Sequence, residues 1–287
     1  MASVLMPIPS RDFDPSEVAI SWRVLTDVGH RVSFATPDGR PGVADTLMLD
    51  GRGLDLWGWI PGLRALPLIG LLLRANRDAR HAYAALERDA NFRFPLRWDA
   101  IEPTAFDGLL LPGGHRARGM QEYLESSLLQ GVVARFFAAD KPVGAICHGV
   151  LLAARSYVAG SDRSVLFGRR TTALTWALEK SAWSLARISR FWEPQYYRTY
   201  SERSGQPRGY MSVQQEVTRA LARPEDFLDV SADAAHASRK RSGLVRDRLG
   251  DDTPAFVVQD GNYVSARWPG DVHTFARTFS RLLDSSL

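Results

Sequence analysis

Short apolar runs alternate with amphipathic stretches along most of the chain, and this order predicts a doubly wound parallel sheet with helices on both faces. Apolar runs that stop at glycine, proline or polar residues indicate strands, and a period near 3.6 residues indicates helices. The expected strands are 4–8, 31–35, 106–114, which runs into a glycine turn, 143–146, and a hairpin over 255–266. The expected helices are 15–28, 77–89, 121–138, 150–154, 176–188 and 211–221. A last helix is expected to begin after Asp271, which serves as its N-cap, and to continue to 283. The segment 164–172 is expected to be a strand pair or an extended segment.

Two segments, 43–97 and 231–252, do not fit this alternation. The first is expected to be an insertion that forms a cap. The second is polar and is expected to be a mobile surface excursion rather than a linker between domains. Because the length suits one large α/β domain, we expect a single domain over residues 1–287.

The most apolar stretch, 54–73, is interrupted by Asp55, Pro61, Arg64 and Pro67. A membrane-spanning helix needs about twenty predominantly apolar residues, so no membrane span is expected. We favour a buried cap or a contact between the subunits of a homodimer. Peripheral contact with a membrane is the alternative.

Composition and charge narrow the classes of function. The net charge is +4, but all but three of the 36 basic residues are arginine and they are spread along the chain, which is typical of a solvated surface and not of a nucleic-acid site. The single cysteine excludes an intrachain disulfide and a multi-cysteine metal site, and it suits a reducing compartment. Residues 1–9 lack the pattern of a secretory signal, so a cytoplasmic location is expected.

The only cysteine, Cys147, lies where an apolar run ends at a thiol, an imidazole and a glycine. This layout predicts a nucleophile elbow, in which a strand turns sharply into a helix at Gly149. A thiol at a helix N-terminus is exposed and has a lowered pKa, so we expect a nucleophile rather than a small buried apolar residue. The adjacent His148 can activate the thiol without a separate base.

Two glycines at the end of the third strand suggest a second part of the same site. Gly113 and Gly114 leave backbone N–H groups free to approach a substrate oxygen, although glycines are also ordinary turn residues there. With the N–H of His148 or Gly149, Gly114 would form an oxyanion hole that stabilises charge on an attacked carbonyl. Their position beside the elbow favours the functional role.

Three ordered motifs resemble the DJ-1/PfpI superfamily, and most closely its Hsp31-like, glutathione-independent glyoxalase branch. They are Asp-Phe-Asp-Pro-Ser-Glu at 12–17, Asp-Gly-Leu-Leu-Leu-Pro-Gly-Gly-His at 107–115 and Ala-Ile-Cys-His-Gly at 145–149. The resemblance covers most of the chain and is vague across 43–97. It implies a flavodoxin-like three-layer sandwich with a mostly parallel central sheet.

The resemblance also implies partners for Cys147. The superfamily places an acid beside the cysteine at the start of the first helix, and Glu17 holds that place. A shielded carboxyl close to a thiol would be protonated and could donate a hydrogen bond or move a proton. The third catalytic residue of the superfamily is an acid that matches Glu179 by spacing. Some relatives bind a metal through the histidine that corresponds to His115, but the chain offers no convincing pair of further ligands, so no metal is expected.

The activity that the resemblance implies is conversion of a 2-oxoaldehyde, such as methylglyoxal, to a 2-hydroxy acid. The substrate is then a small molecule, and no organic cofactor is needed. Two alternatives remain open. One is another hydratase or lyase that acts on a small electrophile, and the other is a stress chaperone or redox sensor in which Cys147 is oxidised.

Overall fold

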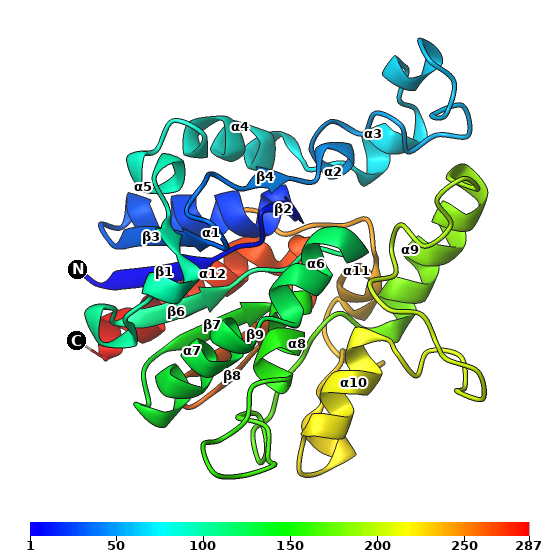
Figure 1. The fold of residues 1–287 in the computed structure, drawn as a ribbon. Coiled ribbons are helices and arrows are strands. Elements are labelled where there is room, and N and C mark those ends of the chain that lie inside the picture. Colours follow the sequence, from blue (N-terminus) through cyan, green and yellow to red (C-terminus); the bar gives the residue numbers. More distant parts are fainter. Residues whose placement is uncertain (287) are drawn as a thin grey trace.

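Seven strands form the central sheet of the protein, whose computed structural model describes residues 1–286 (Figure 1). The strand order is β5-β3-β1-β6-β7-β9-β8, and all neighbours are parallel except β8, which is antiparallel to β9. This arrangement confirms the predicted α/β, flavodoxin-like fold. The strands are β1 Ser3–Pro7, β3 Arg31–Thr36, β5 Leu96–Arg97, β6 Gly108–Leu111, β7 Val143–Ile146, β8 Val257–Asp260 and β9 Tyr263–Ala266.

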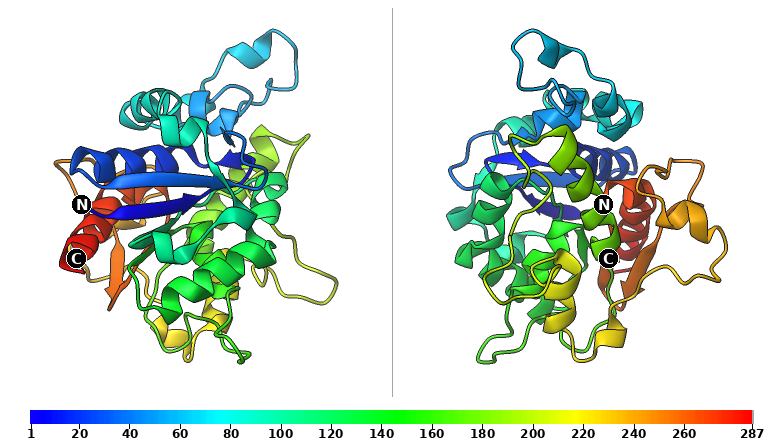
Figure 2. Two further views of the ribbon diagram at one scale, coloured as in Figure 1. Left: turned by 60° about the vertical axis from the view of Figure 1, so that its left-hand side comes forward. Right: turned by 90° about the vertical axis from the view of Figure 1, so that its right-hand side faces the viewer.

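Helices cover both faces of the sheet and bury the two sets of strand side chains (Figure 2). Alternation along β1 places Val4 and Met6 in the core on one face and Leu5 in the core on the other. The first face is covered by α1 Pro15–Asp27, α4 Arg77–Leu86, α5 Ala90–Arg93 and α12 Val272–Ser285. The second face is covered by α6 Ala117–Leu124, α7 Ser127–Ala138, α8 His148–Ala154 and α10 Val213–Ala220.

Two of the sequence predictions in this region are wrong. The helix expected over 121–138 is two helices, α6 and α7, because the side chain of Ser126 accepts a hydrogen bond from the Leu129 amide and starts a new helix. The segment 164–172 forms no strand. It is extended only where isolated bridges join Ser164 to Tyr157 and Thr171 to Phe227.

The insertion at 43–97 has a short strand at each end, one in a separate two-stranded sheet and one in the central sheet. β4 (Val43–Ala44) pairs with β2 (Arg11–Phe13), and β5 adds an edge strand beside β3. Between these strands lie α2 (Thr46–Asp50), a short 3₁₀ turn, α3 (Ile69–Leu73), α4 and α5. The loop between α2 and α3 extends away from the rest of the molecule in each view (Figures 1 and 2). Within residues 1–286, no helix combines the length and apolar character needed to traverse a bilayer.

The last helix, α12, begins where expected but is capped by a distant side chain. Asp271 occupies the N-cap position without accepting a hydrogen bond from the first turn. Instead, the carboxylate of Asp247 accepts from the backbone N–H groups of His273 at 3.2 Å and Thr274 at 2.7 Å. Asp247 belongs to the segment 231–252, which also contains α11 (Ala237–Arg241). This segment is therefore anchored to the body of the fold.

The carboxylate of Asp271 binds a buried guanidinium instead. Both nitrogens Nε and Nη2 of Arg267 donate to it, at 2.9 and 2.7 Å, and the two side chains are 1% and 0% exposed. Removing one partner of a buried ion pair leaves an uncompensated charge, which is far more costly than losing an exposed pair.

We expect Asp271→Asn to lower the free energy of unfolding by about 3–5 kcal/mol, because the Arg267 charge stays buried without its counter-ion. Urea denaturation followed by circular dichroism measures this. The exposed pair of Arg23 and Asp27 is the matched control, and Asp27→Asn should cost no more than about 1 kcal/mol. Equal losses in the two variants would contradict the expectation.

Candidate functional site

Cys147 stands between β7 and α8 in a backbone conformation that residues other than glycine rarely adopt. Its φ is 56° and its ψ is −122°, a strain of about 1–3 kcal/mol that persists only where the surrounding packing imposes it. Gly149 supplies part of that packing, because a Cβ at this position would lie 2.0 Å from the carbonyl oxygen of Leu111. Only glycine lets α8 start this close to β6. The segment thus has the geometry of a nucleophile elbow.

Glu17 is held at the start of α1 by the residues around it. Asp14 is the N-cap of the helix, and its Oδ1 accepts from the amides of Ser16 at 2.7 Å and Glu17 at 3.0 Å. The Glu17 side chain is fully buried, and its Oε2 accepts from the Gly113 amide at 2.6 Å. These contacts place the Glu17 carboxyl at the end of β6, beside the elbow.

The carboxyl of Glu17 favours its protonated form. Burial is the main reason that its pKa lies well above the ordinary value, and the charge of Asp14 acts in the same direction. Because Oε2 accepts from an N–H, the proton belongs on Oε1, which is buried and has no hydrogen-bond partner. The carboxyl and the Cys147 thiol are close enough to perturb the pKa of each other.

The thiol of Cys147 differs from the sequence expectation of an exposed group with a lowered pKa. It is 5% exposed, and burial raises its pKa well above the ordinary value, with the neighbouring carboxyl groups of Glu17 and Asp14 acting in the same direction. Only the backbone N–H of His148 lowers it. The turn that directs the sulfur above the sheet also encloses it, so the thiol needs a base to ionise it.

His148 is positioned to act as that base. Its Nδ1 lies 3.5 Å from the Cys147 sulfur, and its Nε2 lies 2.8 Å from Oγ1 of Thr199. The Thr199 hydroxyl donates its own proton to the carbonyl of His115 at 2.8 Å, so it must accept from Nε2–H. Nδ1 is then unprotonated and faces the thiol. Burial lowers the pKa of His148 to about 3, so the resting imidazole is neutral.

Glu179, which the sequence suggested as a third catalytic residue, does not contact His148. Its carboxylate accepts from Arg198 Nη1 at 2.8 Å and from the Val213 amide at 3.1 Å. Thr199 occupies the orienting position instead. Burial raises the pKa of Glu179 to about 7, and the side chain still borders the pocket described below.

The two glycines of the predicted oxyanion hole do not line the pocket. The N–H of Gly113 is bound to Glu17, so it is not free for a substrate. A Cβ on Gly113 would lie 2.7 Å from the His148 nitrogen, so this glycine brings β6 against the elbow. Gly114 forms an isolated bridge with Phe13 and does not line the pocket. The glycines position Glu17 and the elbow.

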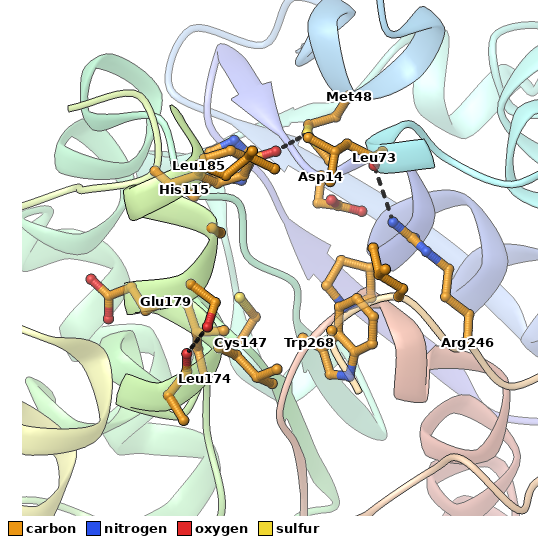
Figure 3. Close-up of a pocket in the computed structure, with 18 of the residues that line it drawn as sticks. Asp14, Met48, Leu73, His115, Cys147, Leu174, Glu179, Leu185, Arg246 and Trp268 are labelled. Carbon is orange, nitrogen blue, oxygen red and sulfur yellow. Dashed lines mark hydrogen bonds between the residues drawn. The ribbon is translucent and has the colours of Figure 1, made fainter. Parts of the chain in front are cut away.

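A pocket of about 340 Å³ opens in front of Cys147 (Figure 3). Four parts of the chain form it: the cap, α9 (Trp176–Ser189), the segment 231–252, and the ends of the central strands. Most of its wall is apolar. The polar groups that reach it include Asp14, His115, Glu179, Tyr197, Arg241 and Arg246.

Arg246 is the most notable polar group of the wall, because no acidic side chain among residues 1–286 lies within ion-pair distance of its guanidinium. It donates to the Leu73 carbonyl at 3.3 Å and to Ser16 Oγ at 3.4 Å, and it lies 5.4 Å from the ring of Trp268. Burial lowers its pKa, and the charge of Asp14 opposes that change. Arg246 thus brings a weakly compensated positive charge to the pocket (Figure 3).

His115 also borders the pocket, and its ring packs against the rings of two tyrosines that are themselves in contact. Its centroid is 4.8 Å from that of Tyr196 and 4.5 Å from that of Tyr197. Its Nε2 is buried without a hydrogen bond, 3.6 Å from Asp45 Oδ2, and burial lowers its pKa to about 3. Within residues 1–286, no three His, Cys, Asp or Glu side chains are grouped to hold a metal.

Sequence reasoning missed Thr199, Asp14 and Arg246. Asp14 had a local signal, because an aspartate before proline and three residues before a glutamate is a helix-start pattern. Thr199 and Arg246 had none, since they reach the site from irregular segments far along the chain. The guanidinium of Arg198 is fully buried between Glu179 and Glu202 and does not line the pocket.

A sequence model described as ThiJ/PfpI family-like matches residues 8–207. The chain belongs to the ThiJ/PfpI family. Among curated proteins, it is 24% identical to a deglycase of Thermococcus kodakarensis, over 77% of this chain and 94% of the relative. It is 25% identical to a deglycase of Pyrococcus abyssi, over 66% of this chain and 69% of that relative.

Solved structures of other proteins share the fold. Rapid Encystment Protein 24 kDa of Francisella tularensis has a TM-score of 0.64 at 15% identity, with 99% of both chains covered. Glyoxalase III of Candida albicans has a TM-score of 0.57 at 13% identity, with 98% of this chain and 97% of that chain covered. The resemblance drawn from the three motifs is therefore confirmed.

The region matched by the ThiJ/PfpI family contains the elbow and Glu17 but ends before 231–252. Arg241 and Arg246 therefore come to the pocket from outside the matched region. The elbow and Glu17 thus lie within the matched residues, and part of the pocket wall comes from residues beyond them.

We expect Glu17→Gln to stabilise the protein increasingly as pH rises. Glu17 has a raised pKa in the folded state, so the folded protein keeps a proton that the unfolded chain loses above pH about 4.5, and stability falls from that pH upward. The variant lacks this loss. Its advantage should grow by up to about 1.4 kcal/mol per pH unit until the folded pKa is reached. Denaturant titrations between pH 5 and 8 measure the difference, and an advantage independent of pH would contradict the buried proton.

We expect Thr199→Val to slow alkylation of Cys147 by iodoacetamide at least about tenfold, because His148 loses the acceptor that fixes its tautomer. The rate reports on this thiol alone, since the chain has one cysteine. Thr199→Ser should restore the rate and its pH profile, and Thr218→Val on α10 is the matched control. An unchanged rate in Thr199→Val would show that the hydrogen bond does not orient the base.

Proposed function

We propose that this chain is a cysteine-dependent enzyme that acts on a small reactive carbonyl compound, and that it converts a 2-oxoaldehyde of the methylglyoxal type to a 2-hydroxy acid. The arrangement that supports this most is the Cys147 thiol between a protonated Glu17 and the unprotonated Nδ1 of His148, at the wall of a pocket. A thiol, a base and an acid in contact are the groups that reversible addition to an aldehyde requires.

The first step is addition of the thiol to the aldehyde. The proton of Cys147 passes to Nδ1 of His148, 3.5 Å away, and the sulfur forms a bond to the aldehyde carbon. The carbonyl π electrons move to oxygen, which takes a proton from Glu17 Oε1. The product is a hemithioacetal, and no external cofactor takes part in its formation.

The second stage moves hydrogen between the two carbons. Glu17, now a carboxylate, removes the C–H proton of the former aldehyde carbon, and the neighbouring ketone oxygen gains the proton held by His148, which gives an enediol. Glu17 then returns its proton to the second carbon while His148 takes the O–H proton from the first carbon, which yields a thioester of the 2-hydroxy acid. Water then cleaves the thioester and restores the thiol. One carbon is oxidised while its neighbour is reduced, so the sum is addition of water without an external oxidant.

The pocket suits a substrate larger than a three-carbon dicarbonyl. About 340 Å³ falls in the size range of sites for small organic ligands, and the wall is mostly apolar. Arg246 and Cys147 both border this space, so an anionic group on the substrate would have a cation to bind while its carbonyl faces the thiol.

Removal of a carbonyl adduct from an amine is a second candidate function. Two relatives at 24% and 25% identity carry the name deglycase, and the space beside Cys147 exceeds the needs of a free 2-oxoaldehyde. The same thiol would capture the carbonyl carbon while the amine leaves with the proton from His148. A redox sensor is favoured less, because Cys147 borders a pocket rather than a closed core.

Turnover assays on the purified chain test the proposal. Wild type should consume methylglyoxal and form lactate, and Cys147→Ser should reduce the rate to that without protein. Glu17→Gln should lower kcat/KM by about 10²-fold or more, whereas the exposed Glu225→Gln is a matched control and should not change it.

Incubation with a methylglyoxal-treated amino acid separates the two candidates. Release of free amine at a rate above lactate formation from methylglyoxal would favour the second candidate. Two results together would overturn the enzymatic proposal in favour of a sensor. Folded wild type would catalyse neither reaction, and in a separate experiment peroxide would oxidise its Cys147.

A further inference from the structure

The end of the cap carries an unusual density of exposed apolar side chains. We call residues 54–73 the apolar tip, and it projects from the body of the molecule (Figures 1 and 2). Six of its large side chains are between 43% and 64% exposed: Leu56, Trp59, Leu63, Leu66, Leu68 and Leu71. The end of α9 extends the surface, because the ring of the exposed Phe191 lies 6.3 Å from that of Trp59. A patch of this kind on a protruding loop indicates a binding surface.

The apolar tip exposes no negative charge. Its only acidic residue, Asp55, is 1% exposed. The carboxylate of Asp55 accepts from the amides of Leu68, Ile69 and Gly70 at 3.0, 2.6 and 3.3 Å, so it holds the loop closed from within. Arg64 is exposed on the tip and forms no ion pair within the described residues.

A positively charged hollow lies at the base of the apolar tip. We call it the basic hollow. It has a volume of about 590 Å³, and its wall includes Trp59, Arg64, Arg116, Arg118, Arg190 and Trp192. The ion pairs of these four arginines involve only two carboxylates, those of Asp12 and Glu193. The hollow therefore has positive charge that an anionic group can bind.

We propose that the apolar tip and the basic hollow together dock the protein on a bilayer that contains anionic phospholipid. Leucine and tryptophan side chains would enter the boundary between headgroups and acyl chains, as such residues do in interfacial segments. A headgroup phosphate would bind in the basic hollow, where arginine forks fit its oxygens. Trp59 and Arg64 belong to both the apolar tip and the basic hollow, so one lipid layer can contact the two surfaces at the same time.

Charge favours a lipid layer over a second copy of the chain. A twofold interface places the same patch on both subunits, so Arg64 of the tip would face another tip without an exposed carboxylate. Like charges across an interface disfavour association. An anionic lipid surface supplies the missing negative charge.

Vesicle co-sedimentation of the full chain tests the docking surface. Vesicles of phosphatidylcholine with about one third phosphatidylserine should bind the protein, and the binding should weaken as salt increases, whereas pure phosphatidylcholine should bind it weakly or not at all. Brominated acyl chains should quench part of the tryptophan fluorescence of the bound protein. Equal binding to both vesicle types, or none to either, would overturn the proposal.

Two variants locate the contact. Trp59→Ser combined with Leu66→Ser should weaken binding at least about tenfold, and Arg64→Gln about fivefold, the value that corresponds to about 1 kcal/mol per arginine near an anionic surface. Leu128→Ser on α7 removes an equally exposed leucine far from the tip and should bind as wild type does. Circular dichroism establishes that each variant is folded. Light scattering tests for a dimer in solution. A wild-type dimer that does not bind vesicles, and that the double substitution Trp59→Ser with Leu66→Ser dissociates, would contradict the proposal and assign the apolar tip to an interface with a second copy.

Discussion

The close contact between the start of α8 and the end of β6 is the constraint on which the candidate site depends. Gly149 lies against the carbonyl of Leu111, and Gly113 lies against the amide of His148, so neither position has room for a side chain. This double contact forces Cys147 into its left-handed conformation and brings the thiol beside Glu17. The hydrogen bond from Gly113 to Glu17 then fixes the acid in the same step. Fold and reactive centre therefore share two glycines.

Burial keeps Cys147, Glu17 and His148 uncharged in the resting site. The thiol and Glu17 carboxyl hold their protons because burial raises both pKa values, and His148 stays neutral because burial lowers its own. Charge then appears only when a proton moves from sulfur to Nδ1. A separated thiolate and imidazolium are costly in an enclosed site unless a reaction uses them at once. The arrangement couples ionisation of the thiol to the arrival of an electrophile.

Local sequence patterns were sufficient for the sheet and the elbow, because each depends on neighbouring residues. The alternation along β1 and the glycine after Cys147 are visible in the chain itself. Long-range contacts were not visible. Glu179 matched by spacing, yet spacing does not fix the direction of a side chain, and its carboxylate points to Arg198. Thr199 lies 51 positions from His148 in an irregular segment without periodicity. The side chain that accepts hydrogen bonds from the first turn of α12 likewise belongs to the distant Asp247 and not to the adjacent Asp271.

Leu72 belongs to two surfaces at once. It is 71% exposed on the apolar tip, and it also lines the pocket that contains Cys147. Any body that covers the tip therefore also shapes the entrance through which a ligand reaches the thiol. Thermodynamic linkage makes this relation reciprocal. If covering the tip changes the affinity of the pocket for its ligand by some factor, then ligand in the pocket changes the affinity of the tip for its partner by the same factor. Through Leu72, binding at the apolar tip and binding in the pocket become coupled equilibria.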